Sequence, residues 1–135
     1  MNRPVLVTGA AGFIGSAVAE RLLADNVSVI GIDSLNDYYD PALKKARLDR
    51  IENTNQALNW RFECIDVSDK RAIENLFVSQ KPRAVIHLAA QAGVRYSIKN
   101  PDTFLKTNII GFGNILECCR KNNVDHLIYA SSSSV

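Results

Sequence analysis

The stretch of sequence that decides the fold is Val5-Leu-Val-Thr-Gly-Ala-Ala-Gly-Phe-Ile-Gly-Ser16, close to the first residue of the chain. Its apolar start predicts a buried strand, and its three glycines predict a tight turn. The apolar periodicity after the glycines predicts a helix. Backbone N–H groups at a helix start point outward and carry partial positive charge, so they can bind a pyrophosphate. The stretch therefore indicates a dinucleotide-binding turn more than an ordinary strand-to-helix turn. The residues expected to contact the dinucleotide here are Gly9, Gly12, Phe13, Ile14 and Gly15.

An acid at the end of the second predicted strand supports this interpretation. Residues 27–32 form an apolar run, and Asp33 follows it, 18 residues after Gly15. In dinucleotide-binding folds an acid about 20 residues beyond the glycines binds the adenosine ribose hydroxyls. A solvated loop acid is the alternative. No Arg or Lys directly follows Asp33 to hold a 2′-phosphate, so the pattern favours NAD over NADP.

Strand and helix patterns alternate along the rest of the chain. Strands are predicted at 4–8, 27–32, 60–65, 84–89 and 126–131, and helices at 13–25, 41–52, 69–80 and 101–122. Short apolar strands separated by helices of ten or more residues are typical of βαβ units. We therefore expect one α/β domain over 1–135, a Rossmann-type doubly wound parallel sheet of strand order 3-2-1-4-5 that stops after strand five. Ligands of such sheets bind in the crevice at the carboxyl ends of the strands.

The composition is that of an ordinary globular protein. The chain has 135 residues, 47% apolar and 22% charged, with a net charge of +2. This balance does not favour nucleic-acid or membrane partners, and no apolar run reaches the ~18 residues of a membrane span. Cys64, Cys118 and Cys119 fit neither a disulfide framework nor a zinc spacing, so no metal is expected. We expect reduced thiols in a cytoplasmic protein, with Cys119 facing a core.

The end of the fourth predicted strand carries several candidate site residues. Small side chains at Ala89 and Ala90 would let a flat ligand lie against the backbone. His87, inside an apolar strand, is more often a satisfied core histidine than a catalyst. Arg95 could hold a phosphate or carboxylate with its planar guanidinium, or could be exposed without a ligand.

Three other features leave alternatives open. Asp66 ends the third predicted strand and could contact adenine or cap the next helix. The hydroxyls of 131–134 could bind a sugar or form a plain serine-rich loop. The basic run between Lys44 and Arg50 is more often a solvated helix face than a binding patch.

Several motifs together resemble the extended short-chain dehydrogenase/reductase superfamily of nucleotide-sugar epimerases and dehydratases. They are Gly9-x-x-Gly12-x-x-Gly15, His87-Leu-Ala-Ala90, Asn108 and Tyr129-Ala-Ser-Ser-Ser-Ser-Val135. Asn36-Asp-Tyr-Tyr-Asp-Pro-Ala-Leu-Lys44, Ala46-Arg-Leu48 and Gln91-Ala-Gly-Val-Arg-Tyr-Ser97 are similar to the UDP-glucuronate 4-epimerase branch in particular.

The resemblance implies an NAD that stays bound and a sugar oxidised at C4, rotated as the 4-keto form and reduced on its other face. It places Ser132 at the C4 oxygen as a catalytic residue. Ser133 and Ser134 stand where related dehydratases have Asp-Glu, which disfavours dehydration, and we expect them to bind substrate, as we do Arg95. The further cofactor-binding residues expected are Asp33, Asn36, Asp66, Val67, Leu88, Ala89, Ala90, Gln91 and Asn108.

The family's catalytic Tyr-x-x-x-Lys does not occur in these 135 residues. We expect it beyond Val135, together with the C-terminal substrate-binding region, so this N-terminal part alone should be inactive. The expected function of the whole is a UDP-glucuronate 4-epimerase that forms a homodimer through the 101–122 helix. Alternatives are a UDP-glucose or UDP-N-acetylglucosamine 4-epimerase and a non-catalytic NAD-binding module.

Overall fold

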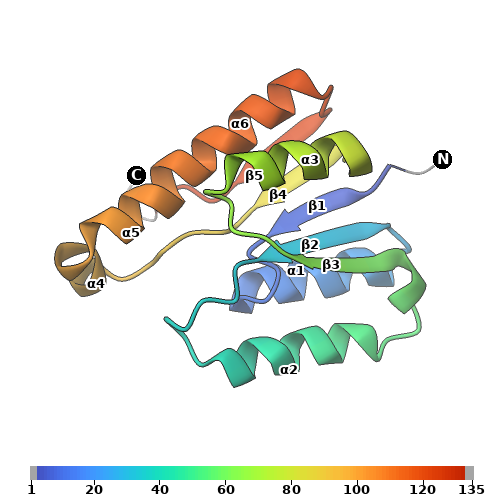
Figure 1. Ribbon diagram of the computed structural model, residues 1–135. Helices are drawn as coiled ribbons and strands as arrows, with labels where there is room; N and C mark the ends of the chain where they lie inside the picture. The colour runs from blue at the N-terminus through green and yellow to red at the C-terminus, as the bar shows by residue number, and fades with distance from the viewer. Residues whose placement is uncertain (1–2, 133–135) are drawn as a thin grey trace.

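The computed structural model describes residues 3–132, which form a parallel sheet with helices on both faces (Figure 1). The strands are β1 (Val5–Thr8), β2 (Val29–Asp33), β3 (Trp60–Cys64), β4 (Ala84–His87) and β5 (His126–Tyr129). Their spatial order is β3-β2-β1-β4-β5, with every neighbouring pair parallel. The predicted fold class and strand order are confirmed. Since the winding direction reverses between β1 and β4, the crevice for a ligand lies at their carboxyl ends.

The helices agree with the sequence patterns except between residues 94 and 111. They are α1 (Phe13–Ala24), α2 (Pro41–Glu52), α3 (Lys70–Gln80), α4 (Val94–Lys99), α5 (Pro101–Leu105) and α6 (Phe112–Lys121), with a 3-10 turn η1 (Ala57–Asn59). The predicted 101–122 helix consists of α5, a π-helical segment η2 (Lys106–Gly111) and α6. The short helix α4 was not expected, because six residues carry too little periodicity to predict a helix. No helix within 3–132 is long and apolar enough to cross a membrane.

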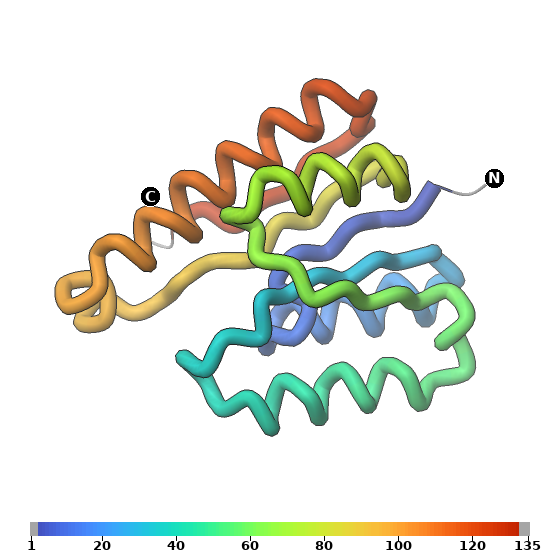
Figure 2. The backbone as a smooth tube through the Cα atoms, viewed as in Figure 1, coloured from blue at the N-terminus to red at the C-terminus, as the bar shows by residue number. Residues whose placement is uncertain are grey.

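Two apolar cores hold the layers together, one on each face of the sheet. Helices α1 and α2 lie on one face and α3 and α6 on the other (Figure 2). Val7 belongs to the core on the α1/α2 side, and Leu6 belongs to the core on the α3/α6 side. Neighbouring residues of β1 therefore pack into the cores on opposite faces of the sheet, since side chains alternate along a strand. All four residues of β1 are buried, as a strand covered on both faces requires.

Both adjacent cysteines contact the α3/α6 core. Cys119 faces this core half-buried, as expected, and Cys118, for which no burial was expected, is a fully buried member of it. Burial raises the pKa of the Cys119 thiol to about 11, so it stays protonated at neutral pH. Successive residues of an α-helix lie about 100° apart around its axis, so the core-facing side of α6 is wide enough to include both cysteines.

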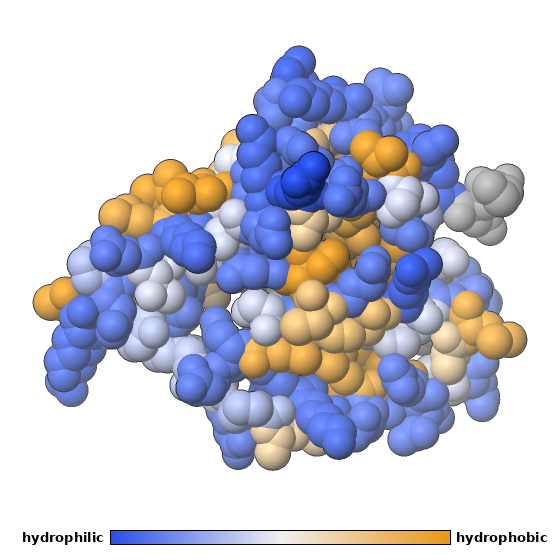
Figure 3. Space-filling model, in the orientation of Figure 1, coloured by the Kyte–Doolittle hydropathy of each residue, from blue (hydrophilic) through white to orange (hydrophobic). Residues whose placement is uncertain are grey.

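An apolar surface runs along the segment from α5 to α6, where orange residues gather in the space-filling view (Figure 3). Ile109, 63% exposed, and Ile110, 53% exposed, lie in η2 between Leu105 and Leu116, which are also exposed. An uncovered group of large apolar side chains is typical of an interaction surface.

Candidate functional site

A cavity of about 440 Å³ opens at the carboxyl ends of β1, β2 and β4. Its size is in the range of ordinary ligand pockets. All of the expected cofactor-binding residues line it except Asn108. The structure thus brings together side chains and turns that lie up to 82 residues apart, from Gly9 to Gln91.

The glycine turn leaves no room for side chains. Gly9 has a φ of +70°, and a Cβ there would lie 3.0 Å from the backbone of Leu88 and Ala89. A Cβ on Gly15 would collide with the carbonyl group of Gly9. Gly12 is the N-cap of α1 and offers no side chain to the N–H groups of the first turn. The turn therefore presents backbone donors to the cavity, which fits a pyrophosphate.

Asp33 lies at the end of β2 with its carboxylate held in place by the backbone. Its Oδ2 accepts a hydrogen bond from Ala11 N at 3.1 Å, and its Oδ1 accepts one from Leu35 N at 2.9 Å. The side chain is nearly buried yet lines the cavity. Because each carboxylate oxygen can accept more than one hydrogen bond, Asp33 keeps capacity for a ribose hydroxyl.

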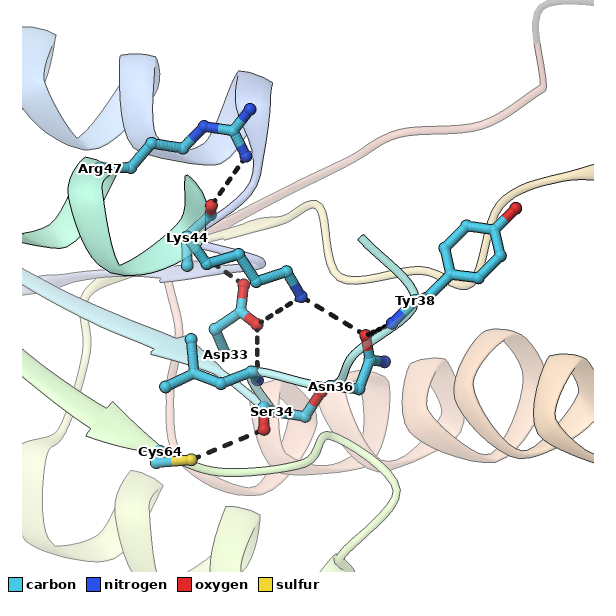
Figure 4. Close-up of polar contacts among 9 residues, drawn as sticks. Asp33, Ser34, Asn36, Tyr38, Lys44, Arg47 and Cys64 are labelled. Carbon is cyan, nitrogen blue, oxygen red and sulfur yellow. Dashed lines mark hydrogen bonds and ion pairs between the residues drawn. The ribbon is translucent and has the colours of Figure 1, made fainter. Parts of the chain in front are cut away.

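Two cations of α2 line the cavity, contrary to the expectation of a solvated basic face, and one of them, Lys44, contacts the Asp33 carboxylate (Figure 4). Lys44 is only 7% exposed, and its Nζ lies 3.5 Å from Asp33 Oδ1 and 3.4 Å from Asn36 Oδ1. Arg47 Nη1 donates to Ala11 O at 3.1 Å. Lys45 and Arg50 are exposed, as expected.

The helical spacing of α2 could have indicated that Lys44 and Arg47 point toward the sheet. Lys44, Arg47 and Ile51 stand at positions i, i+3 and i+7, which share one face of a helix. Ile51 is fully buried in the α1/α2 core, so this face is the one turned toward the sheet. Asp40 caps the helix by accepting from Ala42 N at 2.9 Å, which fixes where the face begins.

A buried network joins the ends of β1 and β4. Thr8 Oγ1 accepts hydrogen bonds from Leu88 N and Ala89 N, each at 2.9 Å. With both lone pairs used, its own hydrogen points to His87 Nδ1, 2.8 Å away, so His87 is neutral with its proton on Nε2. Burial lowers the His87 pKa to about 4. These contacts favour the core histidine over the catalyst.

Asn108 supports the cavity wall from behind. Its Oδ1 accepts from Gln91 N at 2.8 Å, and its Nδ2 donates to Gln91 O at 3.0 Å. Gln91 is buried and lines the cavity, whereas Asn108 is not among its lining residues. Asn108 therefore positions the loop after β4, and its place in a π-helical segment agrees with the frequent use of such segments at functional sites.

The loop between β3 and α3 contributes Asp66 and Val67 to the cavity. Asp66 Oδ1 accepts from Ser68 N at 2.9 Å and from Ser68 Oγ at 2.7 Å, which closes the turn before α3. The N-cap of α3 is Asp69, not Asp66. Asp66 thus orders a turn beside the cavity without capping the helix.

Two tyrosines connect the loops on either side of the crevice. The rings of Tyr38 and Tyr96 lie 4.5 Å apart between centroids. Gly93 has a φ of +100°, and the Tyr38 hydroxyl lies where its Cβ would be. Tyr38 also lines the cavity together with Tyr39. We call the Tyr38–Tyr96 pair the aromatic clasp; it joins the loop after β2 to α4.

The expected substrate-binding and catalytic residues lie away from this cavity or beyond the described chain. Arg95 is exposed on α4 and does not line the cavity. Ser132 is exposed, two residues after Ala130, which does line it. Ser133 and Ser134 lie outside the described residues.

Comparisons with known proteins agree with this geometry. Residues 5–135 match the family described as "NAD dependent epimerase/dehydratase family". The chain is 50% identical over 131 residues to Protein CapI of Staphylococcus aureus, covering 97% of this chain and 38% of that protein. It is 44% identical over 130 residues to the UDP-glucuronate 4-epimerase of Thermodesulfobacterium geofontis, covering 96% and 39%.

A solved structure shares the fold. The UDP-glucose 4-epimerase of Thermus thermophilus, in complex with NAD, superposes with a TM-score of 0.78 at 36% identity, covering 96% of this chain and 37% of that one. The chain spans about two fifths of the length of these three proteins.

Proposed function

This chain belongs to the NAD dependent epimerase/dehydratase family, and we propose that it is the NAD-binding part of a UDP-glucuronate 4-epimerase. The whole protein would interconvert UDP-glucuronate and UDP-galacturonate through a transient 4-keto sugar. The observation that carries the proposal is the single cavity that joins the glycine turn to Asp33. A uronate substrate is supported by the motifs over 36–48 and 91–97 and by the 44% identity to a UDP-glucuronate 4-epimerase.

The cavity residues suit the parts of NAD in order. The first turn of α1 would hold the pyrophosphate, Asp33 the adenosine ribose, and Asp66 and Val67 the adenine. Leu88 to Gln91 would line the nicotinamide end. When bound, NAD supplies a hydride acceptor that can return the hydride to either face of the sugar.

The sugar would be held by residues near the end of β5. We assign Ser132 to a hydrogen bond with the C4 oxygen, and Arg95, Ser133 and Ser134 to substrate binding. A 4-keto uronate is a β-keto acid that loses carbon dioxide readily, so hydroxyl donors around its carboxylate would slow that loss. In the whole protein, Ser133→Ala with Ser134→Ala should weaken uronate binding and increase the decarboxylated by-product; no change in either would contradict their role.

The test of the proposed function is an incubation of the whole protein with UDP-glucuronate. We expect UDP-galacturonate to form with no net reduction of NAD, because the hydride returns to the sugar. Conversion of UDP-glucose in place of UDP-glucuronate would favour the alternative substrate, to which the fold match with a UDP-glucose 4-epimerase also points. Binding of NAD with no epimerisation of either sugar would favour a non-catalytic NAD-binding module.

We further propose that the partner of the apolar α5–α6 surface is a second copy of the chain. The exposed apolar residues of this segment support a homodimer through 101–122. The three cysteines are free, which agrees with the cytoplasm as its place.

A further inference from the structure

Lys44 is buried in a way that its neighbours do not explain. Transfer of an ammonium group from water is costly unless its donors find acceptors. Lys44 Nζ has three donors, and the described residues around it offer two acceptors, Asp33 Oδ1 and Asn36 Oδ1, at the long distances of 3.5 and 3.4 Å. One donor is left for the cavity that Lys44 lines.

Lys44 is not needed to orient the Asp33 carboxylate either. The two oxygens of the Asp33 carboxylate already accept from Ala11 N and Leu35 N at 3.1 and 2.9 Å, shorter than the contact with Lys44. The ammonium therefore adds charge and a donor beside a carboxylate that the backbone has already placed (Figure 4).

We propose that Lys44 is a specificity-determining residue that binds the adenosine ribose of the dinucleotide jointly with Asp33. A ribose hydroxyl would donate a hydrogen bond to the carboxylate and accept one from the ammonium. This inference rests on the proposed NAD site.

The same arrangement predicts how the protein chooses between NAD and NADP. Arg47 lines the same cavity and donates to the carbonyl of Ala11, the residue whose N–H binds Asp33. With Lys44 and Arg47 both at the cavity, the absence of a cation directly after Asp33 is not what disfavours a 2′-phosphate. The negative charge of Asp33 is what repels that phosphate. Once this charge is removed, Lys44 and Arg47 would attract a 2′-phosphate.

The experiment measures NAD and NADP dissociation constants of the whole protein, freed of nucleotide, by isothermal titration calorimetry. Lys44→Met should weaken NAD binding about tenfold, the cost of one charge-assisted hydrogen bond. Lys45→Met is the matched control, since Lys45 is the exposed neighbour on the same helix, and it should change NAD binding less than about twofold. Asp33→Asn should raise the NADP affinity relative to NAD, and Asp33→Asn combined with Lys44→Met should abolish this gain.

Each outcome decides one claim. The role of Lys44 is overturned if the Lys44→Met and Lys45→Met proteins bind NAD equally well and the double variant keeps the NADP gain of Asp33→Asn. This result would leave the proposed NAD site intact. A wild-type protein that binds no NAD overturns the proposed function as well. Should Lys44→Met fail to fold, Lys44→Gln replaces it, with the same expected loss of the NADP gain.

Discussion

At the scale of single residues, the cavity depends on groups that hold the backbone still. Thr8 and His87 face each other across the β1–β4 register, so a hydrogen bond between them follows directly from strand pairing. Through Thr8 Oγ1 the same bond fixes the N–H groups of Leu88 and Ala89 at the cavity wall. A proton on His87 Nδ1 would remove the acceptor for the Thr8 hydroxyl.

The lowered pKa of His87 predicts a loss of stability in acid. The imidazole has a pKa of about 4 in the folded protein, down from 6.5. As the pH falls through 6.5, His87 becomes protonated in the unfolded chain but stays neutral in the folded protein. The free energy of unfolding therefore decreases until about pH 4. The whole shift corresponds to about 3 kcal/mol.

This loss can be measured by urea unfolding at pH 7 and pH 4.5. The His87→Gln protein should lose less stability over this interval than the wild type, since glutamine does not titrate. The His126→Gln protein, altered at the exposed histidine of β5, should follow the wild type. A wild-type pH profile in the His87→Gln protein would show that His87 is not the group responsible.

Substitution by alanine should change stability in opposite directions at two glycines. Gly15→Ala should lower stability by about 1–3 kcal/mol or more and weaken NAD binding, because its Cβ would collide with the Gly9 carbonyl group. Gly113→Ala should raise stability by about 1 kcal/mol, since no atom lies within 4 Å of its Cβ and alanine favours the helix. Thermal unfolding of both proteins checks this. A loss at Gly113 would indicate that another surface packs against it.

At the scale of elements, the loop after β2 and the helix α4 act together through the aromatic clasp. Tyr38 and Tyr96 belong to segments that the chain separates by 58 residues. The positive φ of Gly93 and the missing Cβ allow the Tyr38 hydroxyl to approach. Tyr38 also lines the cavity, so the clasp ties a wall of the cavity to α4.

Loss of the clasp should speed the release of NAD. Tyr38→Ala and Tyr96→Ala should each increase the dissociation rate, and the double variant should increase it by less than the product of the two. The coupling expected for an aromatic pair is about 1 kcal/mol. Stopped-flow fluorescence measures the rates, with Leu58→Ala, at a fully exposed site in η1, as the control. Strictly multiplicative effects would show that the two rings do not act together.

At the scale of the whole molecule, the sheet is covered on both faces at β1 and β2, but β5 and the outer side of the α5–α6 segment are exposed. Ile109→Glu should shift the protein from dimer toward monomer, because a charge in an apolar interface loses its hydration. Sedimentation velocity checks the mass. Val78→Glu, at an exposed apolar position of α3, is the control and should leave the mass unchanged. A wild-type monomer at high concentration would contradict the homodimer.

The element pattern and the glycine turn could be predicted because their causes are local. Alternating short apolar strands and longer helices specify a parallel sheet, and the spacing of three glycines before a helix specifies a tight turn whatever surrounds it. Asp33 was also predictable, since it ends a strand whose neighbours in the sheet follow from the winding. Local information alone could not show that Cys118 is buried more deeply than Cys119, or that α4 is helical.

What the sequence by itself determined is the fold, the glycine turn and the edge of the sheet where the cavity lies. The tertiary structure alone decided which side chains of distant elements meet at that edge: Lys44 beside Asp33, Arg47 against Ala11, Asn108 behind Gln91, and Tyr38 against Tyr96. The physical reason is that hydrophobic burial chooses the orientation of each helix. Once Ile51 is buried against the sheet, Lys44 is carried to the carboxylate, and a basic run that reads as a solvated face becomes part of the site.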